Sequence, residues 1–346
     1  MVKMKDVAVR AGVSIATVSN VITGKRTVSP EVQKAVLQAI SDLDYHVNMV
    51  ARGLKTQRTN TIGVVLPDVT KLFFNDVLKG IMTAAGANGF SINILSSGYD
   101  FSLEKQLVAT LRGNHVDAII LDSCVPYQQS EAWGEELVKA GKDMPVVSLE
   151  NKLGDAVSSI TMDCHYWSSR ITEHLIGQGR RKIFYISGPL SLRHEQDRLD
   201  GYKQALVEHG LQVNESLIVT QDFQSGSAYN AVRQVLEQGL EFDAIQASND
   251  QAAIGAIKAL MEYGIQVPGQ VAVTGFDNLF PSSLVEPAIT TVHVHRYTMG
   301  YRAVMECLRR MGDPEAEPLQ EVLESQLVIR GSSTDQAKSE WDLDNW

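Results

Sequence analysis

The sequence of 346 residues lacks several features that define other classes of protein. It holds only three cysteines, Cys124, Cys164 and Cys307, spaced far apart, which argues against a disulfide framework and a structural zinc site. No apolar run approaches the ~20 residues that a membrane-spanning helix needs. The first residues lack the apolar segment of a signal peptide. These absences predict an intracellular protein that is neither secreted, membrane-bound nor a zinc finger.

Short motifs of common enzymes are also missing. The sequence has no phosphate-binding P-loop, no GxGxxG after a predicted strand and no GxSxG. Aspartates are plentiful, but their spacing does not single out a catalytic pair. We therefore expect no enzyme, no cofactor and no metal site. The weaker alternative is a sugar- or nucleotide-processing α/β enzyme. Turnover of a bound sugar would support that alternative.

Charge is divided unevenly along the chain. Residues 1–58 hold nine basic and four acidic side chains, whereas the remainder holds 22 basic and 37 acidic ones. A small basic head on an acidic body indicates that the head alone meets a polyanion. Because the head is rich in apolar and helix-forming residues, we favour this interpretation over chance clustering in a mobile tail.

The head predicts three short helices, over 5–11, 14–22 and from Ser29 onward. Glycines follow the first two helices, where they can end a helix, and serines precede the second and third, where they can cap one. Pro30 stands at the first position of the third helix, where its missing N–H costs nothing.

Within the head, Ala8, Gly12 and Val18 have the spacing of a helix-turn-helix. The small Ala8 suits the contact between the two helices, Gly12 permits a left-handed turn, and Val18 can be buried between them. The exposed start of the second helix then suits the major groove of DNA. The residues predicted to meet DNA here are Ser14, Ile15, Ala16, Thr17, Ser19 and Asn20, with Lys25 as a phosphate contact.

The rest of the chain alternates between strand and helix. The predicted strands are 61–67, 90–96, 118–121, 146–149, 159–162, 182–187, 217–220, 242–247, 271–275 and 290–294, and the predicted helices are 75–88, 103–112, 167–178, 198–209, 228–237, 251–263 and 297–311. Apolar strands that alternate with amphipathic helices predict an α/β fold with parallel sheets covered on both faces. So many strands over ~270 residues fit two doubly wound units better than one.

Two segments carry a family resemblance. The run DVA at 6–8 followed by GVSIATVS at 12–19 resembles the headpiece of the lactose/galactose-repressor (LacI/GalR) family, and residues 45–54 resemble its hinge. The likeness covers essentially residues 3–330 and is most similar to the Gram-positive catabolite-control type. It implies a headpiece (1–46), a hinge (47–59), a two-lobed effector-binding and dimerisation domain of the periplasmic-binding-protein type (60–330) and a polar tail (331–346). The implied N-lobe is about 60–163 plus 292–322, and the implied C-lobe is about 164–291 plus 323–330.

In that family the hinge forms a helix only on operator DNA, where it enters the minor groove. The resemblance implies that Leu54 is an apolar wedge at the central base step and that Tyr45, Asn48 and Ala51 are further DNA contacts. An inserted leucine costs a few kcal/mol of unstacking, which contacts to the bent DNA offset. Val47 departs from the customary proline and makes the free hinge looser.

The resemblance also implies an effector site between the lobes. In this reading Arg198 grips the effector and Asp277 faces it. Carboxylates, amides and a guanidinium suit vicinal hydroxyls, and aromatic faces cover CH patches. Purine-responsive relatives use the same positions for a base, so the pair alone does not fix the ligand. The implied effector-binding residues are Phe73, Phe74, Asn151, Asp163, His194, Arg198, Phe223, Asn249 and Asp277.

Structural alternatives exist for these residues. Arg198 could be a surface helix cap or ion pair, and the phenylalanine pair could simply be core. Asp250 is expected to cap the helix that begins at Gln251 rather than touch ligand. His293 and His295 share a strand face, but no third ligand has suitable spacing, which favours a structural role.

The resemblance implies a ligand-responsive transcription regulator, most simply a repressor. Its partners would be a near-palindromic operator in double-stranded DNA, a small sugar-like effector and a second copy of the chain, with a phosphoprotein co-regulator if the catabolite-control likeness extends that far. The protein would be bacterial, cytoplasmic and associated with the nucleoid. Whether the effector induces or co-represses stays open. A plain solute-binding protein is disfavoured by the basic head.

Overall fold

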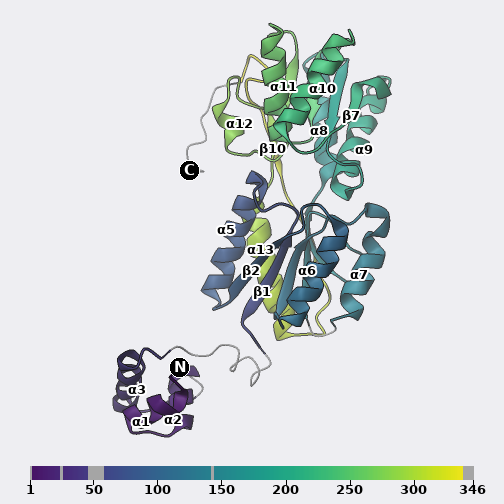
Figure 1. Cartoon of the computed structure of the whole chain (residues 1–346). Coiled ribbons are helices and arrows are strands. Elements are labelled where there is room, and N and C mark those ends of the chain that lie inside the picture. The colour runs from purple at the N-terminus through teal and green to yellow at the C-terminus, as the bar shows by residue number, and fades with distance from the viewer. Residues whose placement is uncertain (1, 24–25, 46–57, 142–143, 338–346) are drawn as a thin grey trace. The chain divides into compact units, whose positions relative to one another are not determined.

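The computed structural model describes residues 2–23, 26–45, 58–141 and 144–337 (Figure 1). The chain divides into two compact units, residues 1–60 and 61–346. Within the described residues, no helix is long and apolar enough to cross a membrane.

The first unit consists of three helices, α1 (Met4–Ala11), α2 (Ile15–Thr23) and α3 (Pro30–Asp42). The Ser29 hydroxyl accepts a hydrogen bond from the Val32 N–H and caps α3, with proline at the first helical position as predicted. Fully buried Val7, Val18 and Val36 each come from a different helix, so the apolar positions of all three helices meet in one small core.

The second unit has two α/β lobes. The first lobe is built on a six-stranded parallel sheet in the order β11-β5-β4-β3-β1-β2. Its elements are β1 (Thr61–Leu66), α5 (Leu72–Ala87), β2 (Ser91–Ser96), α6 (Phe101–Gly113), β3 (Ala118–Asp122), α7 (Ser130–Lys139), β4 (Val146–Leu149), β5 (Ser158–Met162), α13 (Arg296–Gly312) and β11 (Gln320–Leu323). Val64 and Val65 on β1 belong to different cores on the two sheet faces, because successive strand side chains point to opposite sides. Figure 1 shows α5 and α13 side by side on one face and α6 and α7 on the other.

The second lobe is built on a four-stranded parallel sheet in the order β7-β6-β8-β9. Its elements are α8 (Cys164–Gly177), β6 (Ile183–Ser187), α9 (Arg193–Glu208), β7 (Ile218–Thr220), α10 (Ser225–Glu237), β8 (Ala244–Ala247), α11 (Asp250–Glu262), β9 (Ala272–Thr274) and the short α12 (Pro281–Leu284). Apolar residues of α10 and α11 pack with the sheet in one core, and those of α8 and α9 pack in another.

Three crossings join the lobes. The chain passes from β5 to α8, from β10 (Thr291–His293) to α13, and from β11 to β12 (Gln326–Val328). β10 and β12 form an antiparallel pair, which holds two of the crossing segments together. The two doubly wound lobes of the predicted fold are therefore confirmed.

The structure also differs from the sequence-based expectation. Every strand and helix predicted within the described residues is present, but α7, the short α12 and the two last strands, β11 and β12, were missed. The predicted polar tail does not leave the body at residue 331. Ser332 and Ser333 are buried, and the Ser332 hydroxyl donates to the Val273 carbonyl oxygen across 2.5 Å. A segment of small hydroxyl residues can be buried when its polar groups are hydrogen-bonded, and the low hydrophobicity of such a segment does not predict this burial.

Candidate functional site

Ser14, Ile15 and Ala16, at the start of α2, are exposed. Gly12 adopts the left-handed conformation, with φ 67°, and Ala8 and Val18 are buried, as predicted for a helix-turn-helix. The Ser14 hydroxyl accepts a hydrogen bond from the Thr17 N–H across 3.1 Å and so caps α2. The side chain of Ile15 is about half exposed.

The other predicted DNA contacts lie in different settings. Ala16 is exposed, Thr17, Ser19 and Asn20 are half-buried, and Tyr45 is buried in the three-helix core. An ion pair of 2.6 Å between Arg10 and Asp42 joins α1 to α3 at the surface. The remaining predicted contacts, Lys25, Asn48, Ala51 and Leu54, lie outside the described residues.

In the second unit, a cleft of about 560 Å³ lies between the lobes. Many of its residues follow the carboxyl ends of parallel strands, the usual place for ligands in open α/β sheets. The first lobe contributes Pro67, Lys71, Phe73, Phe74, Tyr99, Asp122, Ser123 and Glu150, and the second contributes Leu192, His194, Arg198, Phe223, Asn249, Gln251, Asp277 and Leu279.

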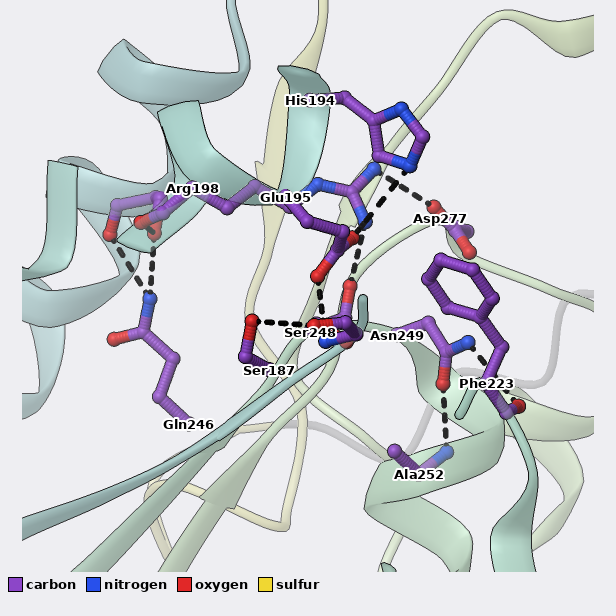
Figure 2. Close-up of polar contacts among 12 residues, drawn as sticks. Ser187, His194, Glu195, Arg198, Phe223, Gln246, Ser248, Asn249, Ala252 and Asp277 are labelled. Carbon is purple, nitrogen blue, oxygen red and sulfur yellow. Dashed lines mark hydrogen bonds and ion pairs between the residues drawn. The ribbon is translucent and has the colours of Figure 1, made fainter. Parts of the chain in front are cut away.

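Arg198 on α9 is the central cation of the cleft (Figure 2). Its side chain is 3% exposed, and it donates hydrogen bonds to Glu195 Oε1 (2.9 Å) and to the Ser248 carbonyl oxygen (2.8 Å). Asp277 Oδ1 lies 3.6 Å from its Nη2. The guanidinium carbon lies 3.9 Å from the centre of the Phe276 ring, within cation–π range. Because its side chain is buried, Arg198 is neither a surface helix cap nor part of a surface ion pair.

The neighbours of Arg198 have shifted pKa values. Burial raises the pKa of Glu195, and the Arg198 charge and the Gly188 N–H oppose that rise. Burial, reinforced by the Arg198 charge, lowers the pKa of His194 to about 3, so this imidazole is neutral near pH 7. A neutral imidazole can both donate to and accept from a ligand hydroxyl.

Carboxyl groups also line the opposite wall. Asp122 and Glu150 share a hydrogen bond, and burial raises the pKa of both. Burial likewise raises the pKa of Asp277, whose Oδ1 makes no hydrogen bond within the described part of the chain. Arg198 Nε is also buried without such a partner. Buried polar atoms normally find a partner, so these two atoms suit a polar ligand in the cleft.

The structure brings together most of the predicted effector residues. Phe73, Phe74, His194, Arg198, Phe223, Asn249 and Asp277 line one cleft. Phe74 is also part of the hydrophobic core, and its ring meets that of Phe73 edge to face. Both of the roles considered for the phenylalanine pair, core and cleft wall, are therefore present.

Two predicted effector residues lie elsewhere. Asn151 does not line the cleft; it is buried behind His194, with Oδ1 3.4 Å from the imidazole Nδ1. Asp163 is exposed, and its carboxylate caps α8 by accepting from the Tyr166 N–H across 2.8 Å. An acid between a strand and a helix serves well as a helix cap, which explains this position.

The expected cap of α11 was wrong by one residue. Asn249, not Asp250, is the N-cap, and its Oδ1 accepts from the Ala252 N–H across 2.7 Å. Asp250 is the first helical residue, and its Oδ2 accepts from the Leu279 N–H across 2.6 Å. Sequence reasoning also missed cleft residues whose signal was their place at strand ends, namely Asp122, the last residue of β3, and Glu150, which follows β4.

Each of the two units matches a known protein family. Residues 3–48 match the family described as "Bacterial regulatory proteins, lacI family", and residues 59–323 match "Periplasmic binding proteins and sugar binding domain of LacI family". Catabolite control protein A of Priestia megaterium is 35% identical, over 86% of this chain and 89% of its own. The ribose operon repressor of Escherichia coli K12 is 31% identical over 96% and 100%. A lac repressor dimer bound to operator and the anti-inducer ONPF superposes with a TM-score of 0.86 at 26% identity, over 96% and 99%.

A helix-turn-helix unit on a two-lobed α/β body with a polar cleft defines a ligand-responsive, DNA-binding transcription regulator, not an enzyme. The chain belongs to the LacI family of bacterial regulatory proteins.

Proposed function

We propose that this protein represses transcription as a homodimer on a near-palindromic operator and that a small sugar or related polyol in the interlobe cleft switches it. The observation that carries the effector part is the buried Arg198 between Glu195 and Asp277, where Arg198 Nε and Asp277 Oδ1 make no hydrogen bond with the described residues. A polyol can donate to the carboxylate and accept from the guanidinium at once.

The proposed domain division assigns one task to each segment. Residues 1–46 read the major groove, residues 47–59 enter the minor groove with Leu54 as the wedge, and residues 60–330 bind effector and the partner copy. The basic balance of residues 1–58 supports a DNA role for this segment. The protein acts in the bacterial cytoplasm at the nucleoid, and a phosphoprotein co-regulator is a further proposed partner.

The charge of the cleft narrows the effector class. Asp122, Glu150 and Asp277 line it, against Arg198 and Lys71 as its cations, and Glu195 already engages Arg198. Burial favours the neutral form of these three carboxyl groups, so an anionic ligand would have to exchange its hydration for Lys71 and an Arg198 that is already engaged. We therefore propose a neutral sugar in preference to a sugar phosphate. The name of the ribose operon repressor relatives makes D-ribose the first probe.

A thermal-shift screen of the full chain tests the effector proposal. The panel holds D-ribose, glucose, cellobiose, glucose 6-phosphate and hypoxanthine. A ligand at 100 times its Kd stabilises the native state by ~2.7 kcal/mol, which raises the unfolding temperature visibly. We expect a neutral sugar to raise the unfolding temperature and glucose 6-phosphate to leave it unchanged.

Two variants on α9 connect the shift to the cleft. Arg198→Ala should abolish the shift, whereas Arg193→Ala should keep it, because Arg193 is half exposed and pairs with Asp197 at the surface. A shift that survives Arg198→Ala would place the ligand elsewhere. A shift by the sugar phosphate alone would overturn the neutral-sugar assignment.

A further inference from the structure

Arg296, the first residue of α13, lies where the lobes meet. Its side chain is 7% exposed, and its donors reach both lobes. Nε and Nη2 donate to Asp76 Oδ2 on α5 of the first lobe, across 3.2 and 2.8 Å. Nη1 donates to the Asp277 carbonyl oxygen and Nη2 to that of Asn278 (3.3 Å), in the loop after β9 of the second lobe. One guanidinium thus contacts an element of each lobe.

Both elements carry walls of the cleft. The first turn of α5 contains Phe73 and Phe74, and the loop after β9 contains Asp277. In that loop, Asp277 and Asn278 have positive φ values of 100° and 52°. Such backbone is unfavourable for residues other than glycine and persists only where surrounding contacts hold it. Arg296 supplies such contacts at the two carbonyl groups.

We propose that Arg296 is a positioning residue that ties the Asp277 loop to α5, so that the second-lobe and first-lobe walls of the cleft move as one. A ligand that engages the Asp277 carboxylate would then shift α5 through Arg296. The shift of α5 on ligand binding rests on the proposed effector response, whereas the link between the Asp277 loop and α5 through Arg296 does not. α5 is the first helix after β1, and β1 follows directly on the segment that joins the body to the head.

The loop has further supports, which make the proposal testable in a folded protein. Arg330 Nη2 donates to Asn278 Oδ1 across 2.8 Å, and Asp250 Oδ2 accepts from the Leu279 N–H. Loss of Arg296 should therefore loosen the loop without unfolding the lobe. Asp76 is the gentler site for substitution, because its side chain is 46% exposed.

Hydrogen exchange of the full chain without ligand tests whether Arg296 couples the Asp277 loop to α5. Within the described residues Asp76 makes no hydrogen bond or ion pair with the loop, so an effect of Asp76→Asn on amides 276–279 has to pass through Arg296. We expect Asp76→Asn and Arg296→Met each to speed exchange at residues 276–279 and in the first turn of α5, by about tenfold for the loss of a charge-assisted hydrogen bond. The double variant should add little to Arg296→Met alone.

Arg302→Met is the matched control. It removes another α13 arginine, which is 58% exposed and 3.8 Å from Glu321, and should change neither segment. Unchanged loop exchange in Asp76→Asn would overturn the tie and leave Arg296 as a local support of its own loop. Additive effects in the double variant would overturn it as well. Because no ligand is present, failure of the effector screen leaves this test unaffected.

Discussion

At the scale of single residues, the cleft depends on charges that are removed from water. Arg198 is held by Glu195, a backbone carbonyl and Asp277, and burial alone would disfavour its charge. The neighbouring carboxylates outweigh that penalty and keep its pKa above the usual value. Removing one member of such a buried group leaves the others unpaired, so these residues are costly to replace even without ligand.

Asp250 supplies a prediction about pH. Burial raises its carboxyl pKa from 3.8 to about 6. The folded state therefore binds this proton more tightly than the unfolded state, and the stabilisation is full below 3.8 and lost as the pH rises through about 6. Relative to Asp250→Asn, the wild-type free energy of unfolding should fall over this window by up to about 3 kcal/mol. Urea unfolding at a series of pH values measures the difference.

Asp155→Asn serves as the control for this pH series. Asp155 is exposed, and a hydrogen bond from Lys152 lowers its carboxyl pKa, so the wild type should show no such fall relative to this variant. A wild-type difference from Asp250→Asn that stays flat between pH 4 and 7 would contradict the assigned burial of the Asp250 charge.

The residues of the site were partly predictable. Arg198 and Asp277 stand in local sequence runs that resemble the family, and the fold places both in the cleft. Glu195 was missed because the predicted helix began at Arg198, whereas α9 begins at Arg193 and puts Glu195 three residues earlier on the same helix face. Boundaries of helices are set by capping and tertiary contacts as much as by local pattern.

At the scale of elements, the helices that cover the sheets approach each other through glycines. A Cβ on Gly80 of α5 would lie 2.1 Å from the Tyr297 carbonyl oxygen of α13, and one on Gly300 would lie 2.0 Å from the Val77 carbonyl oxygen of α5. No side chain fits there. Close contact of α5 with α13 also brings Asp76 within reach of Arg296.

Gly80→Ala should therefore destabilise the body. The new methyl group meets backbone that cannot move freely, and overpacking of this kind costs about 1–3 kcal/mol or more. Gly86→Ala in the same helix is the matched control. Its Cβ would have nothing within 4 Å, and the alanine should stabilise α5 by up to ~1 kcal/mol. Urea unfolding of both variants checks the opposite signs, and two equal effects would contradict the close helix contact.

The missed elements show where local pattern is insufficient. β11 alternates exposed and half-buried residues at the edge of its sheet and pairs with β5, more than 150 residues earlier, so its partner is invisible in the local sequence. α7 buries only Trp133, Gly134 and Leu137, too few apolar positions for a clear helical repeat. The strongly apolar central strands, by contrast, were predictable.

At the scale of the whole molecule, the basic N-terminal segment and the compact acidic body are expected to have separate functions. The basic residues 1–58 precede an acidic body, and residues 61–346 form a compact unit by themselves. A chain of residues 61–346 should remain folded and dimeric, keep the ligand-induced thermal shift and lose DNA binding. Circular dichroism, light scattering and fluorescence anisotropy with duplex DNA measure these properties. Operator binding retained by the truncated chain would contradict the division.

We propose that a ligand in the cleft changes the affinity of the protein for its operator. The most direct test of this proposal is the affinity of the full-length protein for an operator duplex, selected from a random pool, with and without the sugar found by thermal shift. We expect a change of about 5- to 150-fold in the wild type, in one direction or the other, and none in Arg198→Ala, which should still bind the operator. Equal affinities with and without the sugar in the wild type, or an equal change in both proteins, would contradict this proposal.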